Sequence, residues 1–282
     1  GYDQRLGDVS TPVAITTPLS GRQIEALAPR HVRSPGGLVS YSNYSTGLLA
    51  TIVEDVSGLP IEQYERERIW EPLGMRTTQF QTGLTLSSDV AAASYRDDDG
   101  SMSPAPFLPF HPYYWPVGAI SSSLEDMARY ARFHLAAVRG EESPILSAAA
   151  HAQLRSVQHR SHPDVGGFGF QMMSFEWNGE VVFGHGGTWP GYESMLLVFP
   201  ARDVAVFFSI AGPARVGNLS ANIQVIERLL GPYRPSRTYV GASEEDLAQY
   251  QGAYRSTLRA YSGPEALINF LQPSQRIVVS EG

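Results

Sequence analysis

Hydrophobic positions in the first half of the chain recur with the period of an α-helix. The clearest repeat consists of five aliphatic residues: Leu48, Leu49, Ile52, Val53 and Val56. This spacing predicts a helix that Gly58 ends. A second helix is predicted from Pro60, which suits a first turn, with Ile61, Tyr64 and Ile69 facing inward as far as the break at residues 71–74.

Capping signals predict further helices. Ser122 and Glu125 have the spacing of a capping box and open an apolar-striped segment that reaches Leu135. Ser20 and Gln23 have the same spacing. A late helix over Ser220–Leu230 should end at the following Gly-Pro pair, and a short one is expected over Ser243–Tyr250.

The pattern changes to strands after residue 165. The predicted strands are Gly167–Glu176, Val181–Phe183, Glu193–Phe199 and Val204–Ile210. Turns as short as Asn178-Gly179 separate them, so neighbouring strands should run antiparallel. Helices followed by an antiparallel sheet and a closing helix indicate an α+β fold.

Aromatic side chains and prolines are frequent between Pro104 and Pro116. Five aromatic residues within Phe107–Trp115 are too apolar for a solvated loop. We expect this loop to line or cover a substrate cleft or, as the alternative, to pack against the sheet.

Composition narrows the classes of function. The 282 residues are 43% hydrophobic and 17% charged, with a net charge of −7 and no basic cluster, which argues against a nucleic-acid partner. No apolar run reaches membrane-spanning length. Cysteine and lysine are both absent, so this chain by itself completes no mechanism that needs a thiolate or a lysine amine.

Two short segments are candidates for chemistry. Tyr41-Ser42-Asn43 combines a phenol, which would serve as a base if a cation lowered its pKa, with an amide; the alternative is a helix cap formed by Asn43 or Ser45. His185-Gly186-Gly187-Thr188 places an imidazole beside two glycines between two strands; the alternative is a turn or bulge. His159 and His162 lack further ligands, so no metal site is predicted.

Four blocks together resemble a known family. They are Tyr41–Leu49, Glu71–Met75, Val117–Ser123 and Phe183–Tyr192. Their order and spacing are similar to those of the serine β-lactamase-like hydrolases, which include class C β-lactamases, penicillin-binding DD-peptidases, esterases and D-amino-acid peptidases. The resemblance covers roughly residues 30–230 and implies acyl transfer to water through a serine acyl-enzyme, without a cofactor.

The resemblance also implies roles for single residues. Tyr41 matches the tyrosine of proton transfer, and Asn43 matches the asparagine that contacts the substrate amide. His185 and Gly187 match the family's His-x-Gly motif, and Thr188 would lend its N–H group to the oxyanion hole. Trp115 and Tyr192 are expected to contact substrate.

One departure from the family is plain, because its Ser-x-x-Lys nucleophile motif is missing here. We expect a catalytic domain over residues 1–237 that lacks its N-terminal part, followed by a linker and the start of a β-barrel domain over residues 238–282. The missing segment would come from the same polypeptide or from a companion chain. Residues 1–282 alone should then be neither active nor well folded.

The expected substrate is a small molecule or peptide: a D-residue peptide, a small ester or, less readily, a β-lactam. Family members mostly work outside the cytoplasm. The alternative function is a non-catalytic binding or assembly protein that keeps this fold.

Overall fold

The computed structural model describes most of the chain between residues 41 and 234. The described residues are 28–31, 34, 36, 39, 41–82, 85–160, 166–170, 172–212, 219–234, 248–254 and 275–278. The predicted capping box at Ser20, the segment 235–247 and the greater part of the predicted helix Ser243–Tyr250 lie outside them.

A five-stranded antiparallel sheet forms the centre of the fold. Its order is β5 (Gly167–Phe168), β6 (Met173–Trp177), β7 (Glu180–Trp189), β8 (Tyr192–Phe199) and β9 (Val204–Ala211). The predicted turn at Asn178-Gly179 is confirmed, since both residues have the positive φ values, 52° and 83°, of a tight hairpin turn.

Two strand predictions are corrected. The stretch Gly167–Glu176 is not one strand, because it is divided between β5 and β6, which pair with each other. His185–Thr188 does not lie between strands: it is part of β7, which pairs with β8 as far as Trp189. Backbone pairing on the β8 side keeps these residues extended despite their two glycines.

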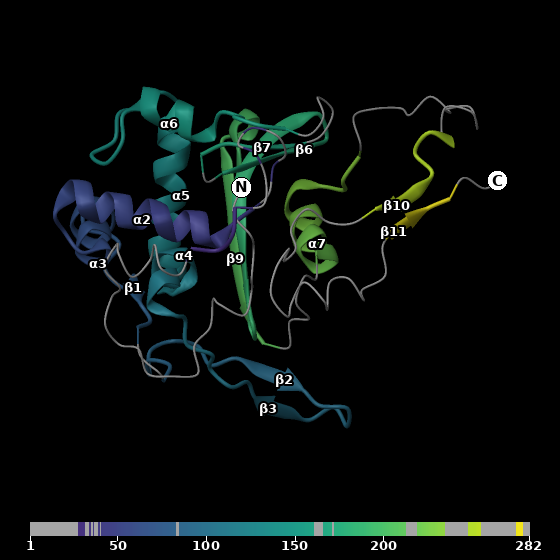
Figure 1. Cartoon of the computed structure of the whole chain (residues 1–282), viewed down its shortest axis with the longest axis horizontal. Coiled ribbons are helices and arrows are strands. Elements are labelled where there is room, and N and C mark those ends of the chain that lie inside the picture. The colour runs from purple at the N-terminus through teal and green to yellow at the C-terminus, as the bar shows by residue number, and fades with distance from the viewer. Residues whose placement is uncertain are drawn as a thin grey trace.

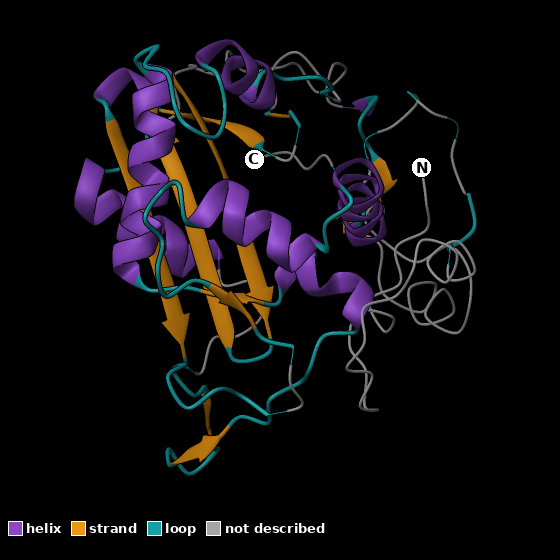
Figure 2. Ribbon diagram, turned by 90° about the vertical axis from the view of Figure 1, so that its left-hand side faces the viewer, coloured by secondary structure: helices purple, strands orange, loops and turns teal. Residues whose placement is uncertain are grey.

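Helices cover both faces of this sheet. α5 (Leu124–Val138) packs on β8 and β9, and α6 (Ala148–Arg155) packs on α5. α7 (Leu219–Leu230) lies on the opposite side of the sheet (Figure 1), and Figure 2 shows helices of the other side in front of the strands. Alternation along β7 serves both layers: Val182 joins the cluster with Ile226 of α7, whereas Phe183 joins the cluster beside α5.

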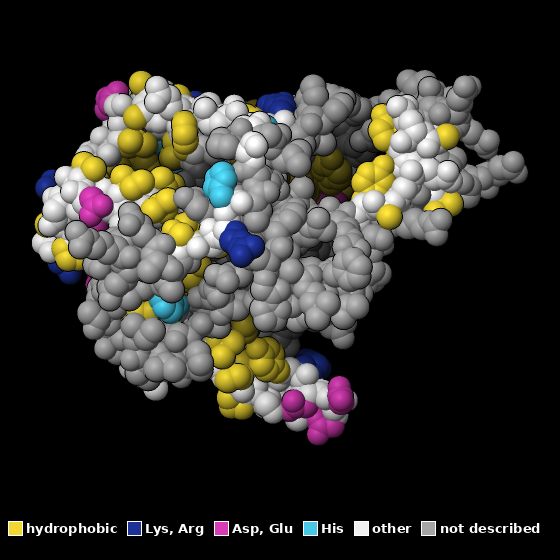
Figure 3. Space-filling model, viewed as in Figure 1, with side chains coloured by type: hydrophobic (Ala, Val, Ile, Leu, Met, Phe, Trp, Pro, Cys, Tyr) yellow, Lys and Arg dark blue, Asp and Glu magenta, His cyan; other side chains and the backbone are white. Residues whose placement is uncertain are grey.

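The first predicted helix is α2 (Asn43–Ser57), and Gly58 ends it with a φ of 72°. Its N-cap is Ser42, whose side chain accepts a hydrogen bond from the Ser45 backbone N–H, so neither Asn43 nor Ser45 is the cap. The apolar stripe that predicted the helix is largely uncovered: Val56 is 84% exposed. Figure 3, viewed as Figure 1, shows hydrophobic atoms at the surface in the left half of the picture, where Figure 1 labels α2.

The buried face of α2 contacts the aromatic loop instead. The Tyr113 hydroxyl donates to the Tyr44 carbonyl, and a Cβ at Gly47 would come within 2.6 Å of the Tyr113 ring. The loop holds two short helices, η3 (Pro112–Tyr114) and α4 (Trp115–Gly118). Four of its aromatic residues are buried in one cluster: Phe110, Tyr113, Tyr114 and Trp115. Phe110 stacks on Trp189 of β7 with ring centroids 4.0 Å apart, so the predicted packing against the sheet is confirmed for this residue, whereas Tyr113 packs on α2.

The second predicted helix is α3 (Ile61–Glu65), which continues as a π-helix, η2 (Arg66–Trp70). α5 begins one residue later than its predicted capping box, because the N-cap is Ser123 and not Ser122. Asp126 in the first turn of α5 is 1% exposed and accepts from the backbone of Thr77 at 2.7 Å, which ties α5 to the segment before β1 (Gln79–Phe80).

Smaller pairings complete the description. β1 pairs with β4 (Ile120–Ser121), and β2 (Ser94–Arg96) pairs with β3 (Met102–Pro104) in a hairpin whose tip carries acidic side chains (Figure 3). η4 (Pro200–Arg202) joins β8 to β9. β10 (Gly252–Tyr254) pairs with β11 (Gln275–Ile277), and the division into domains at residue 237 stays a prediction.

α7 confirms the late helix, since Gly231 with a φ of 90° follows its last residue. Among the described residues, no helix combines the length and apolarity that crossing a bilayer requires.

Candidate active site

Tyr41 and His185 meet although they come from different layers of the fold. Tyr41 directly precedes the N-cap of α2, and His185 lies in the middle of β7. Their ring centroids are 5.8 Å apart, with the ring planes tilted by 37°. Both residues are partly buried. The fold therefore brings together the two side chains that the sequence singled out from separate motifs.

Local structure explains where each side chain lies. The Ser42 cap fixes the backbone at the start of α2, and Tyr41 precedes it. His185 is held in register opposite Leu196 of β8. The glycine that this pairing needs most is Gly184, because a Cβ there would lie 2.0 Å from the Leu196 carbonyl oxygen. At Gly187 a Cβ would meet only the Ser194 side chain, at 2.9 Å.

The backbone selects the tautomer of His185. Its Nδ1 lies 2.6 Å from the carbonyl oxygen of Gly186. A carbonyl oxygen only accepts hydrogen bonds, so Nδ1 carries the proton and donates. In the neutral ring, Nε2 is consequently a hydrogen-bond acceptor.

The environment of Tyr41 favours the protonated phenol. Burial raises the pKa of Tyr41 above its ordinary value, because the phenolate is poorly solvated there. A general base at neutral pH needs the opposite shift. Tyr41 is thus a proton donor in this chain unless a positive charge is placed beside it.

Three other predicted site residues are neighbours of this pair in the sequence. Asn43 is the first residue of α2 and is partly buried. Gly187 and Thr188 are exposed near the end of β7, opposite Ser194 and Glu193 of β8. All three are thus within three residues of Tyr41 or His185 in sequence.

Trp115 and Tyr192 have defined positions within the fold. Trp115 is only 5% exposed, and its indole N–H donates to the Phe110 carbonyl at 3.3 Å. The Tyr192 hydroxyl donates to the carbonyl of Ala91 at 2.9 Å and accepts from the N–H of Ala93. It holds the segment before β2 against β8.

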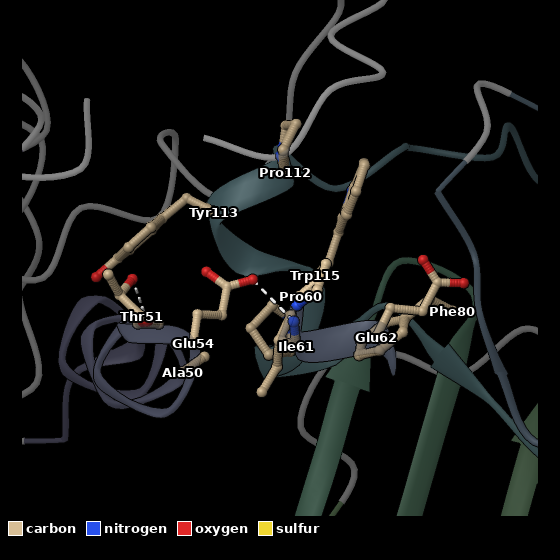
Figure 4. Close-up of a pocket in the computed structure, with 12 residues that line it drawn as sticks. Ala50, Thr51, Glu54, Pro60, Ile61, Glu62, Phe80, Pro112, Tyr113 and Trp115 are labelled. Atoms are coloured by element: carbon tan, nitrogen blue, oxygen red, sulfur yellow. Dashed lines mark hydrogen bonds between the residues drawn. The ribbon is translucent and has the colours of Figure 1, made fainter. Parts of the chain in front are cut away.

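A pocket lies between α2, the start of α3 and the aromatic loop (Figure 4). Glu54 is drawn inside it and accepts from the Ile61 N–H at 2.8 Å, which closes the turn between the two helices. The pocket is lined by Gly47, Ala50, Thr51, Glu54, Pro60, Ile61, Glu62, Phe80, Pro112, Tyr113, Trp115 and Pro116. Tyr41 and His185 are not among them, so this pocket and the Tyr41–His185 pair are separate places.

The sequence did not single out a second group of ionisable side chains, on α3, α5 and α6. His134 and His151 are each 0% exposed, with His134 Nδ1 2.8 Å from His151 Nε2. Tyr130 packs edge-on against His134, with ring centroids 4.6 Å apart. Burial raises the pKa of Glu65, which interacts electrostatically with Tyr130, to about 7. A signal existed for His134, which lies in the predicted apolar-striped helix that reaches Leu135, whereas the helix that carries His151 was not predicted.

Within the described part of the chain, no three or more His, Cys, Asp or Glu side chains are grouped to hold a metal ion.

Comparison with known proteins yields one matching family and several relatives. A family model described as Beta-lactamase matches residues 19–230. Over 177 residues the chain is 28% identical to penicillin-binding protein 4 of Amycolatopsis lactamdurans. The aligned segment covers 60% of this chain and 46% of that protein. Over 161 residues it is 29% identical to a D-aminopeptidase of Brucella anthropi, covering 56% of this chain and 29% of the relative. The chain thus spans less than half of either relative.

Solved structures support the fold. A crystal structure of a D-stereospecific amidohydrolase from Streptomyces superposes with a TM-score of 0.60 at 22% sequence identity, covering 76% of this chain and 62% of that one. The α+β architecture predicted from the sequence is therefore confirmed, and its relatives have the β-lactamase-like fold.

Proposed function

Because the chain belongs to the beta-lactamase family, we propose that it is most of the catalytic domain of a serine hydrolase. The reaction is acyl transfer from an amide or ester to water through a serine acyl-enzyme. The observation that carries this proposal is the approach of Tyr41 to His185, with ring centroids 5.8 Å apart. Two motifs of the family resemblance meet there although they are far apart in the sequence.

The proposed substrate is an amide or ester with a D-residue, or a small ester. Support comes from relatives named as a D-aminopeptidase and a D-stereospecific amidohydrolase. A β-lactam fits less well, because position 185 holds an imidazole and not the permanent ammonium group of a lysine, which would attract a substrate carboxylate.

In this proposal the serine nucleophile and its lysine come from outside these residues, because a Ser-x-x-Lys motif needs a lysine and the chain has none. A lysine ammonium placed beside Tyr41 would lower the pKa of the phenol, against the effect of burial. Tyr41 would then accept the serine proton during attack and return a proton to the leaving group. Without that cation, Tyr41 remains a donor.

The remaining roles follow the same assignment. Asn43 would hold the substrate amide, and the Thr188 N–H group would stabilise the oxyanion. His185, with Nε2 as an acceptor, would hold the Tyr41 hydroxyl or a substrate donor. Gly187 and Tyr192 would contact the substrate. Trp115 would do so only if the substrate also reached the pocket that Trp115 lines, which is separate from the Tyr41–His185 pair.

A binding or assembly protein with the same fold is the second candidate. The burial-raised pKa of Tyr41 and the absence of lysine favour it, because both leave the proton-transfer machinery incomplete in this chain.

Active-site labelling of the full-length protein tests the two candidates. We expect a fluorophosphonate probe to modify one serine, located by mass spectrometry in a Ser-x-x-Lys sequence outside this chain. Tyr41→Phe should slow the labelling, whereas Tyr95→Phe, on the β2–β3 hairpin, should leave it unchanged. A cooperatively folded full-length protein that neither reacts with the probe nor hydrolyses p-nitrophenyl acetate would instead be a binding protein.

A further inference from the structure

His134 and His151 form a fully buried imidazole pair between α5 and α6. Each side chain is 0% exposed, and the facing nitrogens, Nδ1 of His134 and Nε2 of His151, are 2.8 Å apart. One of these two nitrogens donates and the other accepts, so the hydrogen bond is compatible with two neutral rings sharing one proton between them. The pair connects the two helices on one face of the sheet.

Burying this pair costs folding free energy, because two of its polar atoms are unpaired. The outer ring nitrogens, Nε2 of His134 and Nδ1 of His151, are buried and have no hydrogen-bond partner. Apolar side chains of similar volume would fill the same site without orphaned polar atoms. A role that depends on the imidazoles themselves would account for their presence.

The pair contacts the strand that carries His185. The Phe183 ring lies with its centroid 6.1 Å from that of His134 and 6.2 Å from that of His151. Phe183 is 3% exposed and belongs to the core cluster on this face. Side chains two residues apart on a strand share a face and are about 7 Å apart, so Phe183 and His185 lie on the same face of β7.

We propose that the His134–His151 pair is a positioning unit for β7, which keeps His185 beside Tyr41 only while both imidazoles are neutral. Protonation of either outer nitrogen would bury a positive charge without a hydrogen-bond acceptor. The charge is relieved only when α6 separates from α5, which removes the support behind Phe183. The catalytic consequence rests on the function proposed above, whereas the structural consequence does not.

The groups around the pair supply no compensating anion directly. Phe133 packs against both rings, and Tyr130 of α5 presents a phenol, whose pKa burial and the nearby Glu65 raise to about 12, so it stays neutral. Arg155 of α6 interacts electrostatically with His151 and opposes a further positive charge. Glu65 of α3 is coupled to Tyr130 rather than to the imidazoles.

The sign of the pH effect follows from these surroundings. Burial, and then the charge of His151, lower the pKa of His134 to about 3, and burial followed by Arg155 lowers that of His151. An opened state recovers ordinary values near 6.5, so it binds more protons than the closed state below that pH. Closure of α6 is therefore fully favoured above about pH 6.5 and weakens as the pH falls toward 3.

Hydrogen exchange on the full-length protein at pH 7.5 and pH 5.5, corrected for intrinsic rates, measures this opening. In the wild type, protection of Phe133–Arg155 and of Val182–His185 should fall by about 10-fold or more at pH 5.5, since one imidazole contributes about 10-fold per pH unit below its ordinary pKa. In His134→Leu/His151→Leu, which has no imidazole left in the pair, protection should not fall at pH 5.5. Glu65 still titrates there, with a pKa of about 7, but its protonation adds stability as the pH falls. His159→Gln, outside the pair, should behave as wild type.

Activity supplies an independent readout. The acid limb of kcat should move to lower pH in the double variant, whereas a purely structural role would change kcat equally at every pH. His134→Gln/His151→Gln, which has no titratable ring at either position, replaces this double variant if it fails to fold. Equal pH dependence of exchange in wild type and variant would overturn the inference, even with a fully active hydrolase. A pH-dependent opening in a protein without hydrolase activity would instead retain the positioning unit and reject the proposed function.

Discussion

Two of the tyrosine–histidine ring contacts in the described part of the chain lie in different environments. Tyr41 and His185 are tilted against each other at 5.8 Å and are partly buried. Tyr130 and His134 meet edge-on at 4.6 Å, and His134 has no solvent exposure. Phe183, whose ring contacts His134, lies on the same face of β7 as His185. Residue types alone therefore do not distinguish a candidate active site from a support inside the core.

The partner of each imidazole makes the difference. His185 donates through Nδ1 to its own strand, and this leaves Nε2 as an acceptor in a partly exposed place. Nδ1 of His134 is hydrogen-bonded to the imidazole of His151, and its Nε2 is buried without a hydrogen-bond partner. Proton exchange with substrate or solvent is open to the first and closed to the second. Exposure and hydrogen bonding thus decide which pair can take part in chemistry.

The largest expected difference between the pairs appears when the tyrosine hydroxyl is removed from one pair or the other in the full-length enzyme. Tyr41→Phe should lower the acylation rate at least ~100-fold, the scale of lost acid–base catalysis. Tyr130→Phe keeps the ring contact with His134 and should change the rate by less than about threefold. Single-turnover hydrolysis of a p-nitrophenyl ester measures both. Comparable losses in the two variants would remove the distinction between the pairs.

Stability should show the reverse order. His134→Ala removes a fully buried ring and leaves His151 without its partner, so the free energy of unfolding should fall by about 2–3 kcal/mol. His185→Ala, at a partly exposed position, should cost about 1 kcal/mol or less. Urea denaturation at pH 7.5 compares them. A larger loss for His185→Ala would contradict the assignment of His134 to the core.

The smallest effect concerns Glu65, whose pKa burial raises to about 7. A raised carboxyl pKa adds stability that is fully present below about pH 4.5 and is lost as the pH rises through 7. Glu65→Gln mimics the protonated form, so it should be more stable than the wild type by about 1–2 kcal/mol at pH 8, with most of that difference gone at pH 5.

Thermal melts at the two pH values, with the exposed Glu62→Gln as the matched control on the same helix, measure this difference. A pH-independent difference between Glu65→Gln and the wild type would mean that Glu65 is ionised in the fold throughout. It would also leave Tyr130 beside a permanent negative charge.

The sheet was largely predictable because its signals are local. The sequence pattern places β8 and β9 within one residue of their observed ends, and Asn178-Gly179 suffices for the hairpin between β6 and β7. The extent of β7 was not predictable, since two glycines disfavour a strand unless a neighbour pairs with it. Pairing with β8 carries the strand through Gly186 and Gly187 to Trp189.

The helical layer shows the opposite balance. Periodicity found α2, and Gly58 gave its end, but the buried residues are Tyr44, Gly47 and Thr51 rather than the aliphatic stripe. Tyr113 decides this, because its ring fills the space over Gly47. Such a contact joins residues distant in sequence, and no local pattern encodes it.

The sequence by itself determined the family blocks, the α+β order of elements and the two motifs that carry Tyr41 and His185, because these depend on residue identity and short spacing. Only the tertiary structure decided that the two motifs meet, that Trp115 lies in a core cluster, and that His134 and His151 share a proton in the interior. The physical reason is packing. Burial disfavours the charged form of an ionisable side chain, and contacts between segments distant in the sequence determine which side chains are buried.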